Sequence, residues 1–148
     1  MSKTESADLL MKLYDLRREA KMREARNWMI GFFPESAQDV MTAMLDPNTS
    51  AYYRMVVTYW DMAASFANHG AIDEEMFNDA SGEGVVMFAK VEPYLAEIRE
   101  MMKNPAYLGR LESWVMRMPD AKELCAQRRD MIKGFVTASQ EMAKTANG

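Results

Sequence analysis

The single histidine of this chain, His69, is the side chain best suited to acid–base chemistry near neutral pH. The nearest carboxylates along the chain are Asp61 and Asp73, and either would complete the base of a small hydrolase-type enzyme. His69 also precedes Gly70 at a predicted helix end, where the helix dipole favours a cationic imidazole. This position favours a structural role, so we assign no catalytic residue. One histidine also excludes two-histidine zinc sites and ferritin-like di-iron sites.

Cys125 is the only cysteine, so the chain cannot form an internal disulfide. Basic neighbours such as Lys122 and Arg128 would lower the pKa of its thiol. A nucleophilic cysteine also needs a base, and His69 lies on a different predicted element. We therefore expect Cys125 to be a partly buried structural residue.

The acidic segment 73–83 matches a calcium-binding loop only in part. Asp79, Ser81 and Glu83 take the first, third and fifth positions of an EF-hand loop, but the twelfth position is Lys90. A lysine there removes the main ligand of the cation and adds a positive charge. We predict no metal ion and, because no nucleotide-binding fingerprint occurs, no cofactor.

Polar residues follow one narrow stripe on the otherwise apolar helix predicted over 50–69, at steps of four, three, four and three. They are Arg54, Thr58, Asp61, Ser65 and Asn68. One interpretation is that the stripe is the exposed edge of the helix. The other is a buried polar seam in which Arg54 and Asp61 pair with other helices, for example with Glu97 or Arg99.

An apolar pocket beside this stripe is a further hypothesis. The chain holds 16 methionines, which fill cores and also line adaptable binding surfaces. Tyr59 and Trp60 lie next to the stripe and would line such a pocket together with methionines. The candidate ligand-binding residues are Arg54, Tyr59, Trp60, Asp61 and His69.

The sequence predicts an all-α fold, an irregular bundle of six to seven helices around the buried helix over about 50–69. Only 7 glycines and 5 prolines occur, and good helix formers are abundant. Long helices are expected at both ends, over about 4–31 and from residue 120 onward. We expect one domain over 1–148, with 1–8 and 144–148 frayed.

Local signals mark several helix ends. Gly70 fits the left-handed position that follows a helix, and Asp73 is suited to cap the next one. Pro93 should kink or restart the helix in which it lies. Asn104 followed by Pro105 predicts the start of another helix.

Charge and hydropathy narrow the class of protein. Residues 34–88 carry nine acidic side chains and one basic one, Arg54, and the net charge of the chain is −4. A nucleic-acid-binding protein needs a basic face, so we expect no nucleic-acid partner. No apolar run is long enough to span a membrane, and we expect a cytoplasmic protein with no membrane partner.

Three segments carry a resemblance to known proteins: ARNWMIGFFPESAQDVMTAML, YYRMVVTYWDMAASFANHGAIDEEMF and a later EIR. Their order, over about half of the chain, resembles an uncharacterised family of bacterial all-helical proteins of unknown function. The resemblance implies a helical, bacterial protein and supplies no catalytic residue.

Three hypotheses for function follow. The first is a non-enzymatic interaction or scaffold protein that forms a homodimer, or binds another protein, through its first or last helix. The alternative is a sensor or binding protein for a small apolar ligand in a methionine- and aromatic-lined pocket. The third is an enzyme that uses His69 with a carboxylate.

Overall fold

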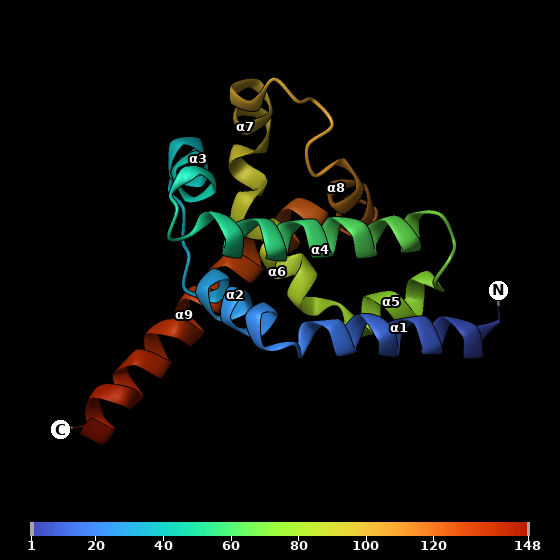
Figure 1. Ribbon diagram of the computed structural model, residues 1–148, viewed down its shortest axis with the longest axis horizontal. Coiled ribbons are helices and arrows are strands. Elements are labelled where there is room, and N and C mark those ends of the chain that lie inside the picture. The colour runs from blue at the N-terminus through green and yellow to red at the C-terminus, as the bar shows by residue number, and fades with distance from the viewer. Residues whose placement is uncertain (1, 148) are drawn as a thin grey trace.

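The structure, a computed structural model, describes residues 2–147, and within them the fold is entirely helical (Figure 1). The all-α prediction is confirmed. The helices are α1 Lys3–Arg17, α2 Ala20–Ile30, α3 Ala37–Leu45, α4 Ser50–Asn68, α5 Glu74–Ala80, α6 Gly82–Val91, the 3-10 helix η1 Glu92–Tyr94, α7 Leu95–Met102, α8 Gly109–Met116 and α9 Ala121–Asn147. Residues 3–8 and 144–147, expected to be frayed, are helical, while residues 1 and 148 lie outside the described part.

Nine α-helices occur in residues 2–147, instead of six to seven, because two of the predicted helices are divided. The first break separates α1 from α2. There the side chain of Glu19 accepts hydrogen bonds from the backbone N–H groups of Lys21 and Met22 and so caps α2. The second break lies at Pro93, in η1, where the sequence predicts a kink or restart.

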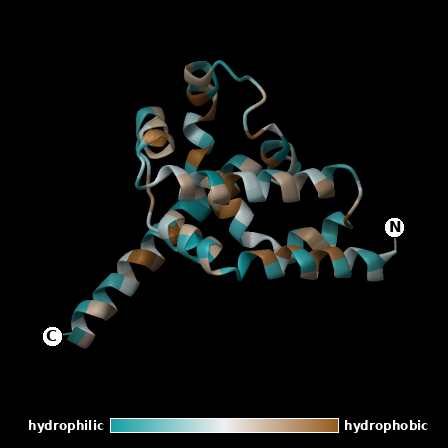
Figure 2. Cartoon of the chain, viewed as in Figure 1, coloured by the Kyte–Doolittle hydropathy of each residue, from teal (hydrophilic) through white to brown (hydrophobic). Residues whose placement is uncertain are grey.

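Helix α4 is central, as predicted, but it shares the centre with α6. α4 packs against α2, α3 and α8, and eight of its side chains are buried. Every residue of α6 from Gly84 to Val91 is buried, and Figure 2 shows hydrophobic residues of α6 in the middle of the molecule. The buried apolar residues form one hydrophobic cluster that joins α2, α4, α6 and α8.

Gly84 lets α6 approach α4 and α8 closely. A Cβ atom at this position would lie 2.7 Å from Cε3 of Trp60 and 3.1 Å from Cζ3 of Trp114. Both distances are shorter than an ordinary carbon–carbon contact. No residue larger than glycine fits here unless one of the two indole rings moves.

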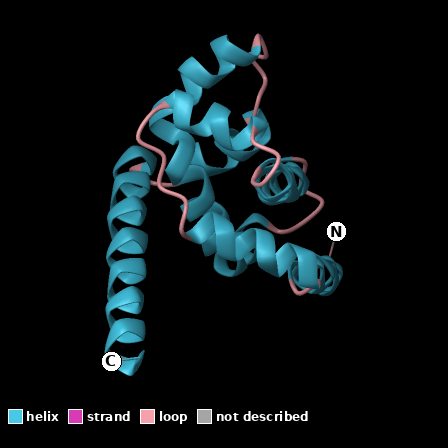
Figure 3. Ribbon diagram, turned by 60° about the vertical axis from the view of Figure 1, so that its left-hand side comes forward, coloured by secondary structure: helices cyan, strands magenta, loops and turns pink. Residues whose placement is uncertain are grey.

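Helix α9 covers α6 with its first turns and then leaves the body of the protein (Figures 1 and 3). Ala121 and Cys125 are its buried residues, and nearly all side chains after Ile132 are exposed. None of the helices in residues 2–147 combines the length and apolarity needed to cross a membrane.

Candidate functional site

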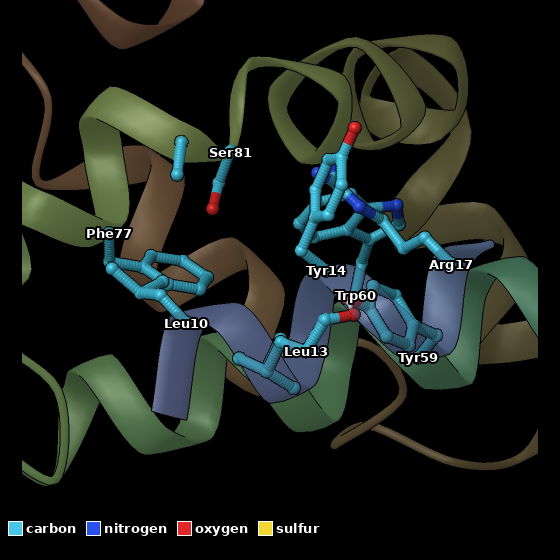
Figure 4. Close-up of a pocket in the computed structure, with 10 residues that line it drawn as sticks. Leu10, Leu13, Tyr14, Arg17, Tyr59, Trp60, Phe77 and Ser81 are labelled. Carbon is cyan, nitrogen blue, oxygen red and sulfur yellow. Dashed lines mark hydrogen bonds between the residues drawn. The ribbon is translucent and has the colours of Figure 1, made fainter. Parts of the chain in front are cut away.

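A cavity of about 190 Å³ lies beneath Trp60, bounded by α1, α4, α5 and the first residue after α5 (Figure 4). Its walls are mostly apolar. The lining residues are Leu10, Leu13, Tyr14, Arg17, Tyr59, Trp60, Ala63, Phe77, Ala80 and Ser81. A volume of this size accepts a ligand of about one aromatic ring, since an apolar cavity of about 150 Å³ binds benzene.

Two residues of the cavity lining each carry a hydrogen-bond donor that has almost no accessible surface and no partner within residues 2–147. These donors are the indole N–H of Trp60 and the Nε–H of Arg17. The side chain of Trp60 is only 2% exposed, and that of Arg17 is 11% exposed. A buried donor without an acceptor costs about 1–3 kcal/mol, so such atoms are uncommon in folded proteins.

The guanidinium of Arg17 lies between two aromatic side chains. Its Cζ atom is 4.8 Å from the ring centroid of Tyr14 and 5.2 Å from that of Trp60. These contacts are favourable cation–π geometries that hold the side chain beside the cavity. Figure 4 shows Tyr14, Trp60 and Arg17 together on one side of the cavity, with Phe77 on the other.

The cluster that contains Arg17 carries one positive charge in excess. Glu83 accepts from Nε of Arg26 through both carboxylate oxygens, at 3.0 and 3.1 Å, whereas Arg17 lies 3.9 Å from the same carboxylate. Glu83 is therefore shared by the two arginines, with Arg26 the closer, and one positive charge of the cluster is left uncompensated. An anion in the cavity would be electrostatically favoured.

Tyr59 has a structural role at the edge of the cavity. Its hydroxyl donates to the backbone carbonyl of Leu13 at 2.6 Å and ties α1 to α4. Burial raises the pKa of Tyr59 to about 12, so the phenol stays neutral. At the other end of α1, the Ser6 hydroxyl accepts from the backbone N–H of Asp73.

Residues 4–118 match a family described as a domain of unknown function (DUF4760). The chain belongs to this family. The predicted resemblance to an uncharacterised family is thus confirmed. The cavity, from Leu10 to Ser81, lies within the matched region of the DUF4760 domain. The chain matches none of the curated proteins and none of the solved structures with which it was compared.

The polar stripe of α4 divides into an exposed part and a paired part. Arg54 is exposed, and its Nε donates to the hydroxyl of Ser50. Asp61 accepts from Arg110 at 2.7 Å and from the backbone N–H of Leu111 at 2.9 Å. The pairing is with α8, not with Glu97 or Arg99, so neither sequence interpretation holds for the whole stripe.

Asp61 acts as the N-terminal cap of α8 although it belongs to α4. Leu108, at the cap position, has φ of 55° and makes no side-chain cap hydrogen bond. The carboxylate of Asp61 satisfies the N–H of Leu111, one of the free donors of the first turn. The predicted start at Asn104 fails, because the Asn104 side chain accepts from the N–H of Ala106 in a turn instead.

His69 is exposed, and its hydrogen-bond geometry is that of a helix end. Nδ1 donates to the backbone carbonyl of Ser65 at 2.9 Å. Its candidate partners are engaged elsewhere, since Asp61 caps α8 and Asp73 caps α5 through the N–H of Met76. Within residues 2–147, His69 forms no ion pair and no cluster of metal-ligating side chains is present.

Of the five candidate ligand-binding residues, only Tyr59 and Trp60 line the cavity beneath Trp60. Asp61 lines a separate shallow depression with Arg110, and Arg54 and His69 are exposed. No methionine lines the cavity among the described residues. Sequence reasoning did not select Arg17, Leu10 and Leu13 as site residues, because only the tertiary structure brings α1 against α4 and α5. The one local signal is that Arg17 follows Tyr14 by three residues, a spacing that permits a cation–aromatic contact.

A buried lysine is a second feature that sequence reasoning missed. Lys90 is 2% exposed, and its Nζ donates to the backbone carbonyls of Ile30 and Phe32 at 3.0 and 2.7 Å. Nζ also lies 3.9 Å from the ring centroid of Phe33. Burial lowers the pKa of Lys90 to about 8. These contacts attach the segment that follows α2 to helix α6. The position of Lys90 in the apolar run GVVMFAKV is the sequence signal from which its burial could have been predicted.

Cys125 is completely buried, which is deeper than the partly buried position expected from the sequence. Burial raises the pKa of Cys125 to about 11, which keeps the thiol protonated at neutral pH.

Proposed function

We propose that this DUF4760 protein is a non-enzymatic interaction protein that pairs with a second copy of itself through the projecting half of α9. The observation that carries the proposal is a row of exposed apolar side chains on that half. Met131, Phe135 and Met142 are 50%, 71% and 73% exposed. With Ala138 they follow steps of four, three and four, which is the heptad spacing of a coiled-coil seam.

The projecting half of α9 needs a partner for energetic reasons. An isolated helix of about 12–15 residues is marginally stable in water. Beyond Ile132, only Val136 is even partly buried, and the polar and apolar residues alternate along the helix (Figure 2). Burial of Phe135 and two methionines against another helix would stabilise this segment by about 1.5–3 kcal/mol per side chain.

Charge complementarity favours an antiparallel second copy. Asp130 and Lys144 lie seven residues before and after Thr137, and Lys133 and Glu141 lie four residues before and after it. In an antiparallel pair centred on Thr137, each charge therefore lies at the level of an opposite charge. A parallel pair would align like charges.

Side-chain size supports the same arrangement. An antiparallel pair shifted by half a residue, with its centre between Val136 and Thr137, sets Phe135 of one copy against Ala138 of the other and Met131 against Met142. At Phe135 and Ala138 a large side chain then faces a small one, which suits close helix packing. The two bodies would also lie at opposite ends of the helix pair, since α9 leaves the body at one end only (Figure 3).

Sedimentation velocity on the full-length protein tests this proposal. We expect twice the mass of one chain at micromolar concentration and a monomer for the variant Phe135→Glu. Gln140→Glu is the matched control, because it adds the same charge on the opposite face of the helix and should leave the dimer intact. A wild-type protein that stays monomeric from micromolar to millimolar concentration would refute the dimer.

The orientation can be tested separately. A spin label at Asn147→Cys is specific because the native Cys125 is buried. Ten residues separate Asn147 from Thr137, so two labels lie about 30 Å apart along an antiparallel pair and side by side in a parallel one. A short distance would keep the dimer and overturn the antiparallel arrangement.

The cavity beneath Trp60 supports a second candidate function, the binding of a small apolar ligand. Its size, its apolar walls and its two unpartnered donors are the observations that favour it. The test is whether benzene shifts the indole N–H signal of Trp60 in a two-dimensional NMR spectrum. The signals of Trp28 and Trp114, which do not line the cavity, serve as internal controls.

A further inference from the structure

The unused polar groups of the cavity beneath Trp60 restrict its ligand to one chemical class. We infer that the cavity binds a small aromatic carboxylic acid of one ring, with the carboxylate on Arg17 and the ring between the apolar walls. This inference rests on the second proposed function, a small-ligand site, and names the ligand and the residue that selects it.

The two unpartnered groups of the cavity lining need hydrogen-bond acceptors. Both unpartnered groups, Nε–H of Arg17 and Nε1–H of Trp60, are donors that cannot accept a hydrogen bond. A ligand must therefore bring acceptors. A carboxylate supplies two acceptor oxygens and forms the stronger, charge-assisted bond with a guanidinium.

The charge around Arg17 favours a negatively charged ligand. Glu83, the nearby acid, is paired through both oxygens with Arg26, and the remaining acidic groups of this region, Asp15 and Glu19, are exposed. Arg17 and Arg26 therefore share one carboxylate, and this group of three side chains presents a net charge of +1 beside an apolar space. A cationic ligand would be repelled, and a neutral hydrocarbon would leave both donors unpaired.

The side of the cavity opposite Arg17 has room for one aromatic ring. Phe77 and Leu10 lie on the side of the cavity away from Arg17 and Trp60, and the Ser81 hydroxyl points toward the space between them (Figure 4). The volume of about 190 Å³ admits one ring with a carboxylate but not a fused ring system with a long side chain. Leu10, Leu13 and Phe77 offer the apolar contacts that a ring requires.

The cavity is partly open to solvent, so a ligand can enter it without a displacement of α1. Tyr14 and Ala80, which line the cavity, are exposed. Helix α1 is held in place by the hydrogen bonds from the Tyr59 hydroxyl to the Leu13 carbonyl and from the Asp73 N–H to the Ser6 hydroxyl.

The test compares benzoate with benzamide, which has nearly the same shape but no charge. Titrations of the full-length protein are followed by the indole N–H signal of Trp60, assigned with Trp60→Phe. We expect benzoate to bind at least about tenfold more tightly than benzamide. The variant Arg17→Met should bind benzoate and benzamide with equal affinity. Arg18 is the exposed neighbour of Arg17, so Arg18→Met is the matched control and should keep the preference for benzoate.

The outcomes separate the ligand class from the existence of the site. Equal affinity for benzoate and benzamide, or an equal loss in Arg17→Met and Arg18→Met, overturns the inference and keeps an apolar site. If benzene, benzamide and benzoate all leave the Trp60 signal unchanged at about 10 mM, both the site and the inference are overturned. Circular dichroism on Arg17→Met shows whether that variant is folded, and benzamide binding to it provides a second check.

Discussion

The close packing of α6 against α4 and α8 predicts that Gly84→Ala destabilises the protein. The added Cβ would meet Cε3 of Trp60 at 2.7 Å, Cδ2 of the same ring at 3.0 Å and Cζ3 of Trp114 at 3.1 Å. Carbon atoms pack best at about 3.5–4.0 Å, so one ring must move by up to about 1 Å.

Neighbouring side chains hold both rings, although Trp60 also borders the cavity. The indole N–H of Trp114 donates to the Asn78 side chain at 2.7 Å, and Phe77 lies against the ring edge-on. Trp60 packs edge-on against Tyr59 and under Arg17. Overpacking of this kind costs about 1–3 kcal/mol, and alanine regains up to about 1 kcal/mol over glycine in a helix. The expected net loss is about 1–2 kcal/mol, or a fall in Tm of about 2–8 °C for a chain of this size.

Thermal unfolding followed by circular dichroism measures this loss. Gly82→Ala is the matched control, because it lies on the same helix and no atom would lie within 4 Å of the added methyl group. Gly82→Ala should leave Tm unchanged or raise it slightly. A Gly84→Ala protein with the Tm of wild type would refute the packing of α6 described above.

Two further predictions concern buried polar groups. The pKa of Lys90 is lowered from 10.5 to about 8 by burial, so between these values the unfolded chain binds more protons than the folded one. The free energy of unfolding should therefore rise by up to about 3 kcal/mol as pH increases through this window. Urea unfolding at pH 7 and pH 10 measures the rise, which the variant Lys90→Met should lack. Equal pH dependence in the two proteins would contradict this prediction. Asp61→Ala should lower the free energy of unfolding by about 1–2 kcal/mol, because α8 loses its cap. Asp79 is exposed, so the control variant Asp79→Ala should change the free energy of unfolding little. Equal losses in the two variants would argue against the cap.

Local sequence signals predict the fold wherever neighbouring residues decide a helix end. Gly70 has φ of 73° after α4, and Asp73 caps α5, both as the sequence indicates. The α1–α2 break escapes prediction because glutamate is an unusual N-cap residue. The start of α8 is misplaced because its cap, Asp61, comes from another helix and leaves no local signal.

The candidate site can be predicted only in part for a similar reason. Trp60 is an evident candidate, because a large aromatic side chain on a core helix commonly lines any pocket nearby. Arg17 is not, because its environment depends on Glu83 and Arg26, which are 57 residues apart in sequence. How closely Glu83 pairs with Arg26 and with Arg17 is decided by the tertiary structure alone, and these distances leave a net positive charge beside the cavity.

The two proposed functions are physically separable, and this separation can be used to test them against each other. No residue of α9 lines the cavity among those described, and the projecting half of α9 lies outside the region matched by DUF4760. Effects at sites without shared contacts are additive. Phe135→Glu should therefore abolish pairing and leave benzoate affinity unchanged, while Arg17→Met should do the reverse. If one substitution changed both properties, α1 and α9 would have to communicate through the core helices α4 and α6, and ligand binding would then control assembly.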